Sequence, residues 1–176
     1  RLEFFFLFGA RILIGLAHPF QDIARLGSKV TAEIAAARGV KEGEACISPA
    51  SHSAFSNPLE LIHFVQKLRD LSGGKPVGFK FCVGHPWEWF GIVKAMLETG
   101  IYPDFIVIDG SEGGTGASPL SSIKHAGSPW ELGLAETQQT LVLNGLRSRI
   151  RVQADGQMKT GRDVVIGALL GADEFG

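Results

Sequence analysis

Short apolar runs recur along the chain and predict buried strands. They cover residues 75–84, 104–109 and 149–156, and residues 172–176 begin another. Each run is rich in β-branched or aromatic side chains, which is typical of strands covered on both faces, as in a parallel sheet.

Between these runs, apolar residues recur at helical spacing and predict helices. The first begins at Asn57-Pro58 and ends near Leu71. The others cover residues 86–98, 131–146 and 160–170. Strand and helix therefore alternate, which predicts βαβ units and an α/β fold with a parallel sheet.

Polar segments follow the predicted strands at His85, at Asp109 to Gly116 and at Asp155 to Thr160. Because parallel strands end at the same edge, these segments share one face, which is where barrel enzymes place their sites. An open doubly wound sheet has the same rhythm, but this placement favours a barrel. Four units predict a partial (β/α)8 TIM barrel, about its C-terminal half, completed by strands outside this chain.

The beginning of the chain is different. Residues 4–17 are apolar but contain Arg11, and they fall short of the roughly 20 residues of a membrane-spanning helix. We expect a buried strand or helix here, with the apolar region of a signal peptide as the alternative. We therefore separate an N-terminal segment, 1–28, from a domain over 29–176.

A short helix is predicted at the start of that domain. Ser28 or Thr31 would cap it, and Arg38-Gly39 would end it. The polar residues 44–58 that follow are either a ligand-facing segment or a connector.

A glycine-rich loop follows the strand that ends at Asp109. Gly113, Gly114 and Gly116 allow close approach of a ligand to the backbone, and Thr115 adds a hydroxyl. A flexible turn is the simpler interpretation, but the loop continues to Trp130, which is long for a connector.

Lys80 interrupts an apolar strand. Alternation places Val77, Phe79 and Phe81 on one face and Lys80 with Cys82 on the other. A buried ammonium is costly unless it is paired or lies at a ligand site. The alternative is a lysine that extends from an edge strand into solvent.

The turn that begins with Asp155 and Gly156 leads into a predicted helix through Gln157, Lys159 and Thr160. Backbone N–H groups at a helix start bind phosphate well, aided by the helix dipole. This turn is therefore the candidate phosphate site.

Composition excludes several partner classes. The formal charge of −1 over 176 residues gives no electrostatic case for nucleic acid or an anionic membrane. Cys46 and Cys82 cannot form a disulfide framework, and as buried thiols they suit a reducing, cytoplasmic compartment. The five histidines show no metal-binding spacing, so no metal is predicted. The three tryptophans are expected to pack rather than to line a ligand.

Residues 112–127, Glu-Gly-Gly-Thr-Gly-Ala-Ser-Pro-Leu-Ser-Ser-Ile-Lys-His-Ala-Gly, resemble the signature of the FMN-binding domain of glutamate synthases. The resemblance extends over residues 29–176. Residues 46–56 and 78–88 are more similar to a stand-alone glutamate-synthase-like family, whereas 118–127 and 161–166 resemble the large subunit.

The resemblance implies FMN as cofactor and a role for Lys80 at the flavin's pyrimidine end. There the ammonium would favour the anionic reduced flavin and hold the carboxylate of a 2-oxo acid, so Lys80 is the candidate catalytic residue. The implied flavin-lining residues are Asp109, Gly113, Gly114 and Thr115. The implied phosphate turn contains Asp155, Gly156, Gln157 and Lys159, although the family usually has a second glycine where Gln157 stands.

The implied reaction is reduction of 2-iminoglutarate, formed from 2-oxoglutarate and ammonia, to L-glutamate. An iron–sulfur cluster, an amidotransferase domain and an electron-donor subunit or ferredoxin are expected only outside this chain, which alone is expected to be inactive. Two alternatives remain: a non-catalytic barrel fragment that only binds a ligand or partner, and a phosphate-binding barrel enzyme without redox chemistry.

Overall fold

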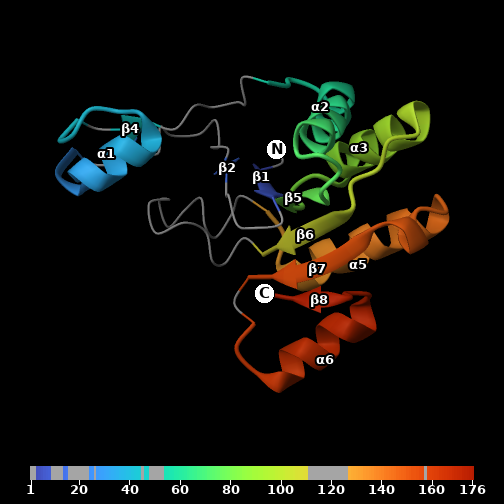
Figure 1. The fold of residues 1–176 in the computed structure, drawn as a ribbon. Helices are drawn as coiled ribbons and strands as arrows, with labels where there is room; N and C mark the ends of the chain where they lie inside the picture. Colours follow the sequence, from blue (N-terminus) through green and yellow to red (C-terminus); the bar gives the residue numbers. More distant parts are fainter. Residues whose placement is uncertain are drawn as a thin grey trace.

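The computed structural model of the chain describes residues 3–8, 14–15, 24–25, 27–44, 46–47, 54–110, 127–156 and 158–176. These residues form a six-stranded sheet in the order β2-β1-β5-β6-β7-β8 and a separate two-stranded sheet of β3 and β4 (Figure 1). The predicted α/β class is confirmed.

Four neighbouring strands of the large sheet are parallel and follow one another in chain order. They are β5 (Val77–Cys82), β6 (Phe105–Asp109), β7 (Arg151–Asp155) and β8 (Glu174–Phe175). Their pairing register aligns Lys80 with Val107 and Gln153, and Cys82 with Asp109 and Asp155. All four predicted strands are present, and their carboxyl ends meet at one edge of the sheet.

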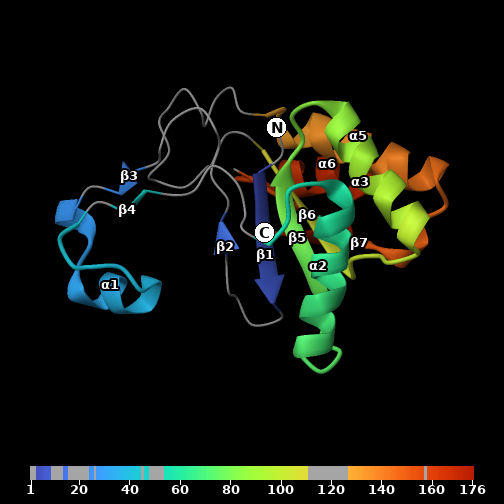
Figure 2. The ribbon, with the colours of Figure 1, turned by 90° about the horizontal axis from the view of Figure 1, so that it is seen from above.

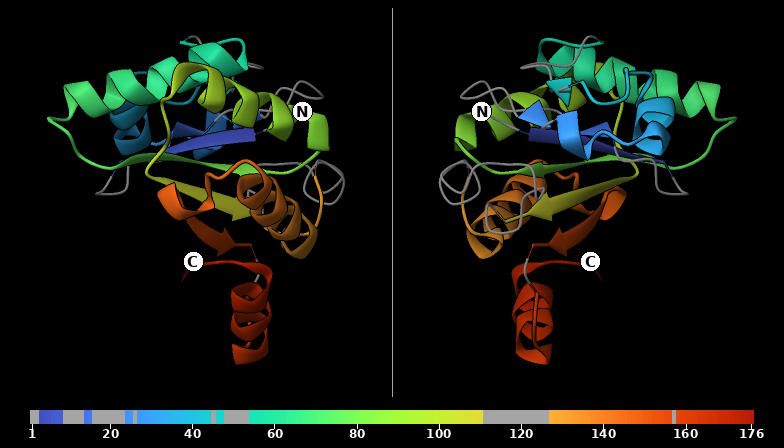
Figure 3. Two further views of the ribbon diagram at one scale, coloured as in Figure 1. Left: turned by 90° about the vertical axis from the view of Figure 1, so that its right-hand side faces the viewer. Right: turned by 90° about the vertical axis from the view of Figure 1, so that its left-hand side faces the viewer.

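Four helices lie on one face of the sheet; the first precedes β5, and the other three connect the parallel strands. They are α2 (Pro58–Leu71), α3 (Pro86–Thr99), α5 (Trp130–Leu143) and α6 (Gly161–Leu170). Neighbouring helices pack side by side in chain order, as Figures 2 and 3 show. A doubly wound sheet would place helices on both faces. The one-sided arrangement is compatible with a segment of a barrel.

Helix starts follow the signals in the sequence. The Asn57 side chain accepts a hydrogen bond from the Glu60 N–H at 2.9 Å, which caps α2. Thr160 and Asp163 form a reciprocal capping box at α6. Thr31 rather than Ser28 caps α1 (Ala32–Arg38), and Gly39, with φ of 66°, ends it.

Several predicted boundaries were wrong by a few residues. The strand predicted over 75–84 covers only Val77–Cys82. The helix predicted over 131–146 ends at Leu143, because Gly145 adopts a left-handed φ of 67° that stops the helix. A 3-10 turn over Arg147–Arg149 follows, so β7 begins at Arg151 and not at Arg149.

The N-terminal segment contributes a strand. β1 (Glu3–Phe8) pairs antiparallel with β5 along its whole length, and β2 (Ile14–Gly15) pairs antiparallel with β1. Of the predicted strand or helix, the strand is therefore present. Its antiparallel direction was not predicted and breaks the parallel pattern.

The remaining elements form a small unit apart from the main sheet (Figures 1 and 2). It contains β3 (Ala24–Arg25), a 3-10 turn (Gly27–Lys29), α1 and β4 (Cys46–Ile47). β4 lies within the segment 44–58 predicted as a polar loop, and residues 48–53 lie outside the described part.

The core lies between the four parallel strands and their helices. Phe79, Phe81, Ile106 and Ile108 are fully buried on this side of the sheet. Phe81 stacks on Trp89 of α3 with ring centroids 5.2 Å apart. The apolar side chains of β5 therefore face the helices, and Lys80 lies on the opposite face of the sheet, as predicted.

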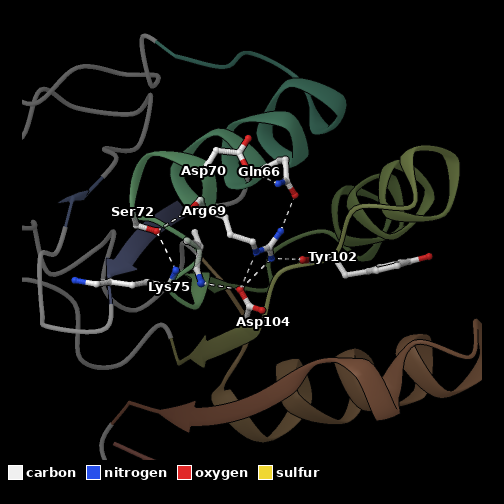
Figure 4. Close-up of polar contacts among 8 residues, drawn as sticks. Gln66, Arg69, Asp70, Ser72, Lys75, Tyr102 and Asp104 are labelled. Atoms are coloured by element: carbon white, nitrogen blue, oxygen red, sulfur yellow. Dashed lines mark hydrogen bonds and ion pairs between the residues drawn. The ribbon is translucent and has the colours of Figure 1, made fainter.

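A polar network fixes the amino ends of β5 and β6 (Figure 4). Arg69 of α2 donates to the Asp104 carboxylate at 2.9 Å and to the Tyr102 carbonyl at 2.6 Å. The same carboxylate accepts the Val77 N–H at 2.7 Å. Asp104 thereby links α2 to the first residue of β5.

The next pair of strands repeats this arrangement. Arg147 donates to the Asp173 carboxylate and the Gly171 carbonyl, at 2.9 and 2.8 Å. Asp173 accepts the Val152 N–H at 2.9 Å. Both networks lie at the amino ends of the strands, the end of a barrel associated with stability rather than catalysis.

We expect Asp104→Ala to destabilise the fold by about 1–2 kcal/mol. The change leaves the Arg69 guanidinium and the Val77 N–H without their shared acceptor, and Asp104 is partly exposed, which moderates the loss. Urea unfolding measures it. Asp70→Ala on α2 removes a carboxylate that accepts an exposed hydrogen bond from the Gln66 side chain, and it should cost under about 0.5 kcal/mol. Equal losses in the two variants would contradict the role of Asp104.

Candidate functional site

The candidate site lies at the carboxyl ends of β5, β6 and β7, on the face away from the helices. Lys80 extends from β5 and contacts the carboxylates of Asp109 on β6 and Asp155 on β7. The Lys80 Nζ to Asp109 Oδ2 distance is 2.9 Å. We refer to these three residues as the Lys80 cluster.

The pairing register explains why these three side chains meet. Asp109 and Asp155 are register partners at the ends of adjacent parallel strands, so both point to the same face. Lys80 precedes their row by two residues, and its long side chain reaches both carboxylates. The sequence predicts each of the three residues at the site but not their mutual pairing. Alternation along a strand predicts which side chains share a face. The register between strands, which shows that the three side chains meet, cannot be read from the sequence.

Burial and pairing shift the three pKa values differently. Burial alone would lower the pKa of Lys80, but the hydrogen bond to Asp155 and the charge of Asp109 raise it overall. Burial raises the pKa of Asp109, and Lys80 offsets this only in part. For Asp155 burial is outweighed by its contacts with Lys80 and the Gly156 N–H, so its pKa is lowered.

The turn after β7 packs directly against the turn after β6. Gly156 has φ of 103°, and a Cβ there would lie 2.6 Å from the Gly110 nitrogen and 2.7 Å from Asp109 Oδ1. The Gly156 N–H donates to its neighbour Asp155 Oδ1 at 2.6 Å. Only glycine fits this position, and the two turns form one backbone-lined surface beside the Lys80 cluster.

The start of α6 is the predicted phosphate position. Asp163 accepts hydrogen bonds from the Lys159 and Thr160 N–H groups at 3.0 and 2.8 Å, and these backbone bonds lower its pKa. A phosphate there would share those donors with Asp163. The exposed Lys159 side chain and the following first-turn N–H groups of α6 are the other donors available at this end.

The carboxyl end of β5 adds contacts that the sequence does not predict. Gly127 packs against Cys82, whose thiol donates to the Ser128 carbonyl, and the Ser128 N–H donates to the Val83 carbonyl at 2.8 Å. His85 stacks on Trp87 with ring centroids 4.3 Å apart. Trp89 and Trp130 are buried as predicted, whereas Trp87 is 64% exposed.

The structure brings together Lys80, Asp109, Asp155 and Gly156, and places Lys159 at the neighbouring helix start. Gly113, Gly114, Thr115 and Gln157 lie outside the described residues, as does the signature segment 112–126. Their assignments stay predictions.

Over the described part of the chain, no three His, Cys, Asp or Glu side chains group closely enough to hold a metal ion. The helices in the same residues are all too short or too polar to span a bilayer.

Comparison with known proteins gives the family context. A family model described as a conserved region in glutamate synthase matches residues 20–176. Over 152 residues, the chain is 45% identical to the large chain of an NADPH glutamate synthase of Bacillus subtilis and to ferredoxin-dependent glutamate synthase 2 of Arabidopsis thaliana. Each alignment covers 85% of this chain but only 10% and 9% of the relative.

A shorter relative is a glutamate synthase large subunit-like protein of Bacillus subtilis, 42% identical over 147 residues. This alignment covers 84% of the chain and 28% of that protein. The chain thus spans about a tenth of the length of the first relatives and about a quarter of the shorter one.

Proposed function

The chain belongs to the glutamate synthase family, and from this premise we propose that it forms part of an FMN-dependent oxidoreductase that makes L-glutamate from 2-oxoglutarate and ammonia. The Lys80 cluster carries the proposal, because it presents a cation at the carboxyl ends of three parallel strands. That edge is where α/β enzymes of the barrel type bind their ligands.

We further propose that the four sequential parallel strands are about the C-terminal half of a (β/α)8 barrel. Three features support this: the four strands keep chain order, the helices share one face, and Lys80, Asp109 and Asp155 meet at the carboxyl ends of the strands. Strand order would reverse at some point in a doubly wound sheet, and among the four parallel strands β5 to β8 it does not.

The residues present fit FMN. Lys80, only 17% exposed, offers a cation to the pyrimidine end of the ring system, and Asp109 lies beside it. The glycine turn at Gly156 allows backbone approach, and Lys159 with the start of α6 suits a phosphate. We include Gly113, Gly114, Thr115 and Gln157 in the proposed flavin site on the family resemblance alone.

When bound and reduced, FMN would supply the hydride that converts 2-iminoglutarate to L-glutamate. The residues of this chain would contribute to the reaction by positioning the reactants and by electrostatic stabilisation. Lys80 would hold positive charge beside the ring and orient a substrate carboxylate, and Asp155 fixes the Lys80 side chain in place. The close contact between the turns after β6 and β7 shapes the backbone surface beside the Lys80 cluster.

The other parts of the reaction would come from outside this chain. The names of the relatives include NADPH in one case and ferredoxin in the other, and we propose one of these as the electron donor. We also propose a cytoplasmic setting. An iron–sulfur cluster and an amidotransferase domain complete the proposed assembly.

A non-catalytic barrel fragment is the second candidate. It is favoured by the antiparallel β1 beside β5, where a barrel requires a parallel strand.

Titration of the chain with FMN tests the proposal. We expect quenching of flavin fluorescence that saturates at equimolar ratio, and weaker binding of riboflavin, which lacks the phosphate. A folded chain that binds neither flavin would contradict the proposal. If FMN binds, anaerobic incubation of the reduced complex with 2-oxoglutarate and ammonium separates an active enzyme, which forms glutamate, from the binding-only fragment and from a barrel without redox chemistry.

A further inference from the structure

The Lys80 cluster carries more negative than positive charge. It contains two carboxylates and one ammonium, and the side chains of Lys80, Asp109 and Asp155 are 17%, 15% and 31% exposed. With all three groups ionised, the cluster has one excess negative charge. Because the side chains are largely withdrawn from water, solvent screens this charge only in part.

An anionic ligand beside Lys80 therefore meets an ammonium that two carboxylates already neutralise. A 2-oxo acid with two carboxylates would add negative charge to a cluster that already has an excess. Binding then requires either that a carboxylate moves away from Lys80 or that one carboxylate becomes neutral. Movement of either carboxylate would break its ion pair with Lys80, so it is the less favourable route.

We propose that Asp109 takes up one proton from solvent when an anionic ligand binds beside Lys80, so that Asp109 is the residue that adapts the charge of the site to its ligand. This inference rests on the proposed function, because it concerns the binding of 2-oxoglutarate at the same cluster.

Burial assigns the proton to Asp109 and not to Asp155. Lys80 contacts both carboxylates, but the Asp155 side chain is 31% exposed and accepts the Gly156 N–H at 2.6 Å. Asp109 is the least exposed of the three groups. In agreement, burial raises the pKa of Asp109, whereas the contacts of Asp155 lower its pKa despite burial.

Among the described residues, three elements pack against β6 and bring charged or titratable groups near Asp109. β5 brings Lys80 and Cys82, and β7 brings Asp155. The backbone hydrogen bond involving Gly110 lowers the pKa of Asp109, which opposes proton uptake without reversing the net upward shift. α5 covers the other face of β6, and the acid in its first turn, Glu131, is exposed.

Calorimetry of 2-oxoglutarate binding to the FMN-loaded chain, from pH 5.5 to 8.5, tests the proposal. The carboxylates of 2-oxoglutarate stay ionised across this range, so any linked proton belongs to the protein or the flavin. We expect the wild-type affinity to rise as the pH falls, by up to about tenfold per unit, with net uptake of a proton measured in buffers of different ionisation enthalpy. Asp109→Asn should bind about tenfold more tightly at pH 8 and lose both the pH dependence and the proton uptake.

Glu98→Gln is the matched control, because Glu98 is an exposed carboxylate at the far end of α3 and the change alters net charge equally. It should behave as wild type. Wild-type binding without proton uptake, or an Asp109→Asn variant that keeps the wild-type pH dependence, would overturn the proposal.

A second measurement, on the ligand-free chain, tests the role of Asp109 independently of the proposed function. Carboxyl-carbon NMR should show Asp109 titrating at higher pH than Asp155, and Asp155→Asn should lower the pKa of Asp109 by removing a negative neighbour. Absence of 2-oxoglutarate binding would contradict the proposed function only. Asp109 titrating below Asp155 would overturn this inference whether or not the ligand binds.

Discussion

Lys80→Met is expected to destabilise the chain by about 2 kcal/mol near pH 7, although methionine fills a similar volume. Removing the ammonium leaves Asp109 and Asp155 facing one another with no cation between them, and breaking a buried pair in this way is costly. Partial exposure of the three side chains reduces the loss below that of a fully buried pair.

The stability lost in Lys80→Met should depend on pH, because the cluster contributes to stability only while its groups are ionised. The raised pKa of Lys80 gives stability that is present below its ordinary value of 10.5 and lost as pH rises through the folded-state pKa. The lowered pKa of Asp155 gives stability that is present above 3.8 and lost as pH falls through its folded-state pKa. The difference between wild type and variant should therefore be largest between these limits and shrink at both extremes.

Urea unfolding at several pH values measures this difference. Lys94→Met is the matched control, since Lys94 is an exposed lysine on α3 far from the cluster, and it should change stability by less than about 0.5 kcal/mol at every pH. A Lys80→Met variant as stable as wild type near pH 7 would show that the ion pairs contribute nothing to the fold. Under the proposed function this variant also loses most of its FMN affinity.

Gly156→Ala is expected to cost about 2–4 kcal/mol. The residue has φ of 103°, which side-chain-bearing residues rarely adopt, and the new Cβ would lie 2.6 Å from the backbone nitrogen of Gly110. The turns after β6 and β7 would have to separate, so FMN affinity should fall by at least about tenfold under the proposed function.

Gly39→Ala separates conformational strain from the steric contact. Gly39 also has a left-handed φ, of 66°, but a Cβ there would meet no atom within 4 Å. It should cost only about 1 kcal/mol, the price of the backbone conformation. Thermal unfolding of both variants provides the comparison, and equal losses would show that the contact with Gly110 does not matter.

Much of the fold was predictable because its signals are local. Apolar runs located the four parallel strands, and Asn57, Gly39 and Thr160 marked helix ends through their capping chemistry. The end of α5 was missed because Gly145 ends the helix before Leu146, whose side chain continues the apolar pattern in the buried core. Periodicity cannot distinguish such a residue from one more helical turn.

Features that depend on contacts between distant segments were not predictable. The direction of β1 follows from its pairing with β5, which no local pattern specifies. The pairing of Lys80 with Asp109 and Asp155 requires the register of three strands. Alternation alone gave the correct face for Lys80, but not its partners.

The same limit applies to the amino-end networks. Arg69 and Asp104 are far apart in sequence, and neither interrupts an apolar strand in the way that Lys80 does. The sequence therefore indicates the charge within a strand, at Lys80, but gives no sign that charges at helix and strand ends, such as Arg69 and Asp104, pair with each other.

Mapping of FMN contacts by backbone amide NMR tests the central claim most directly. The account predicts shifts on FMN addition concentrated at the carboxyl ends of β5, β6 and β7, at Gly156 and at the start of α6. Amides near Asp104 and Asp173, at the opposite end of the strands, should not shift. Shifts centred on those two aspartates, or none at the Lys80 cluster despite saturating FMN, would contradict it.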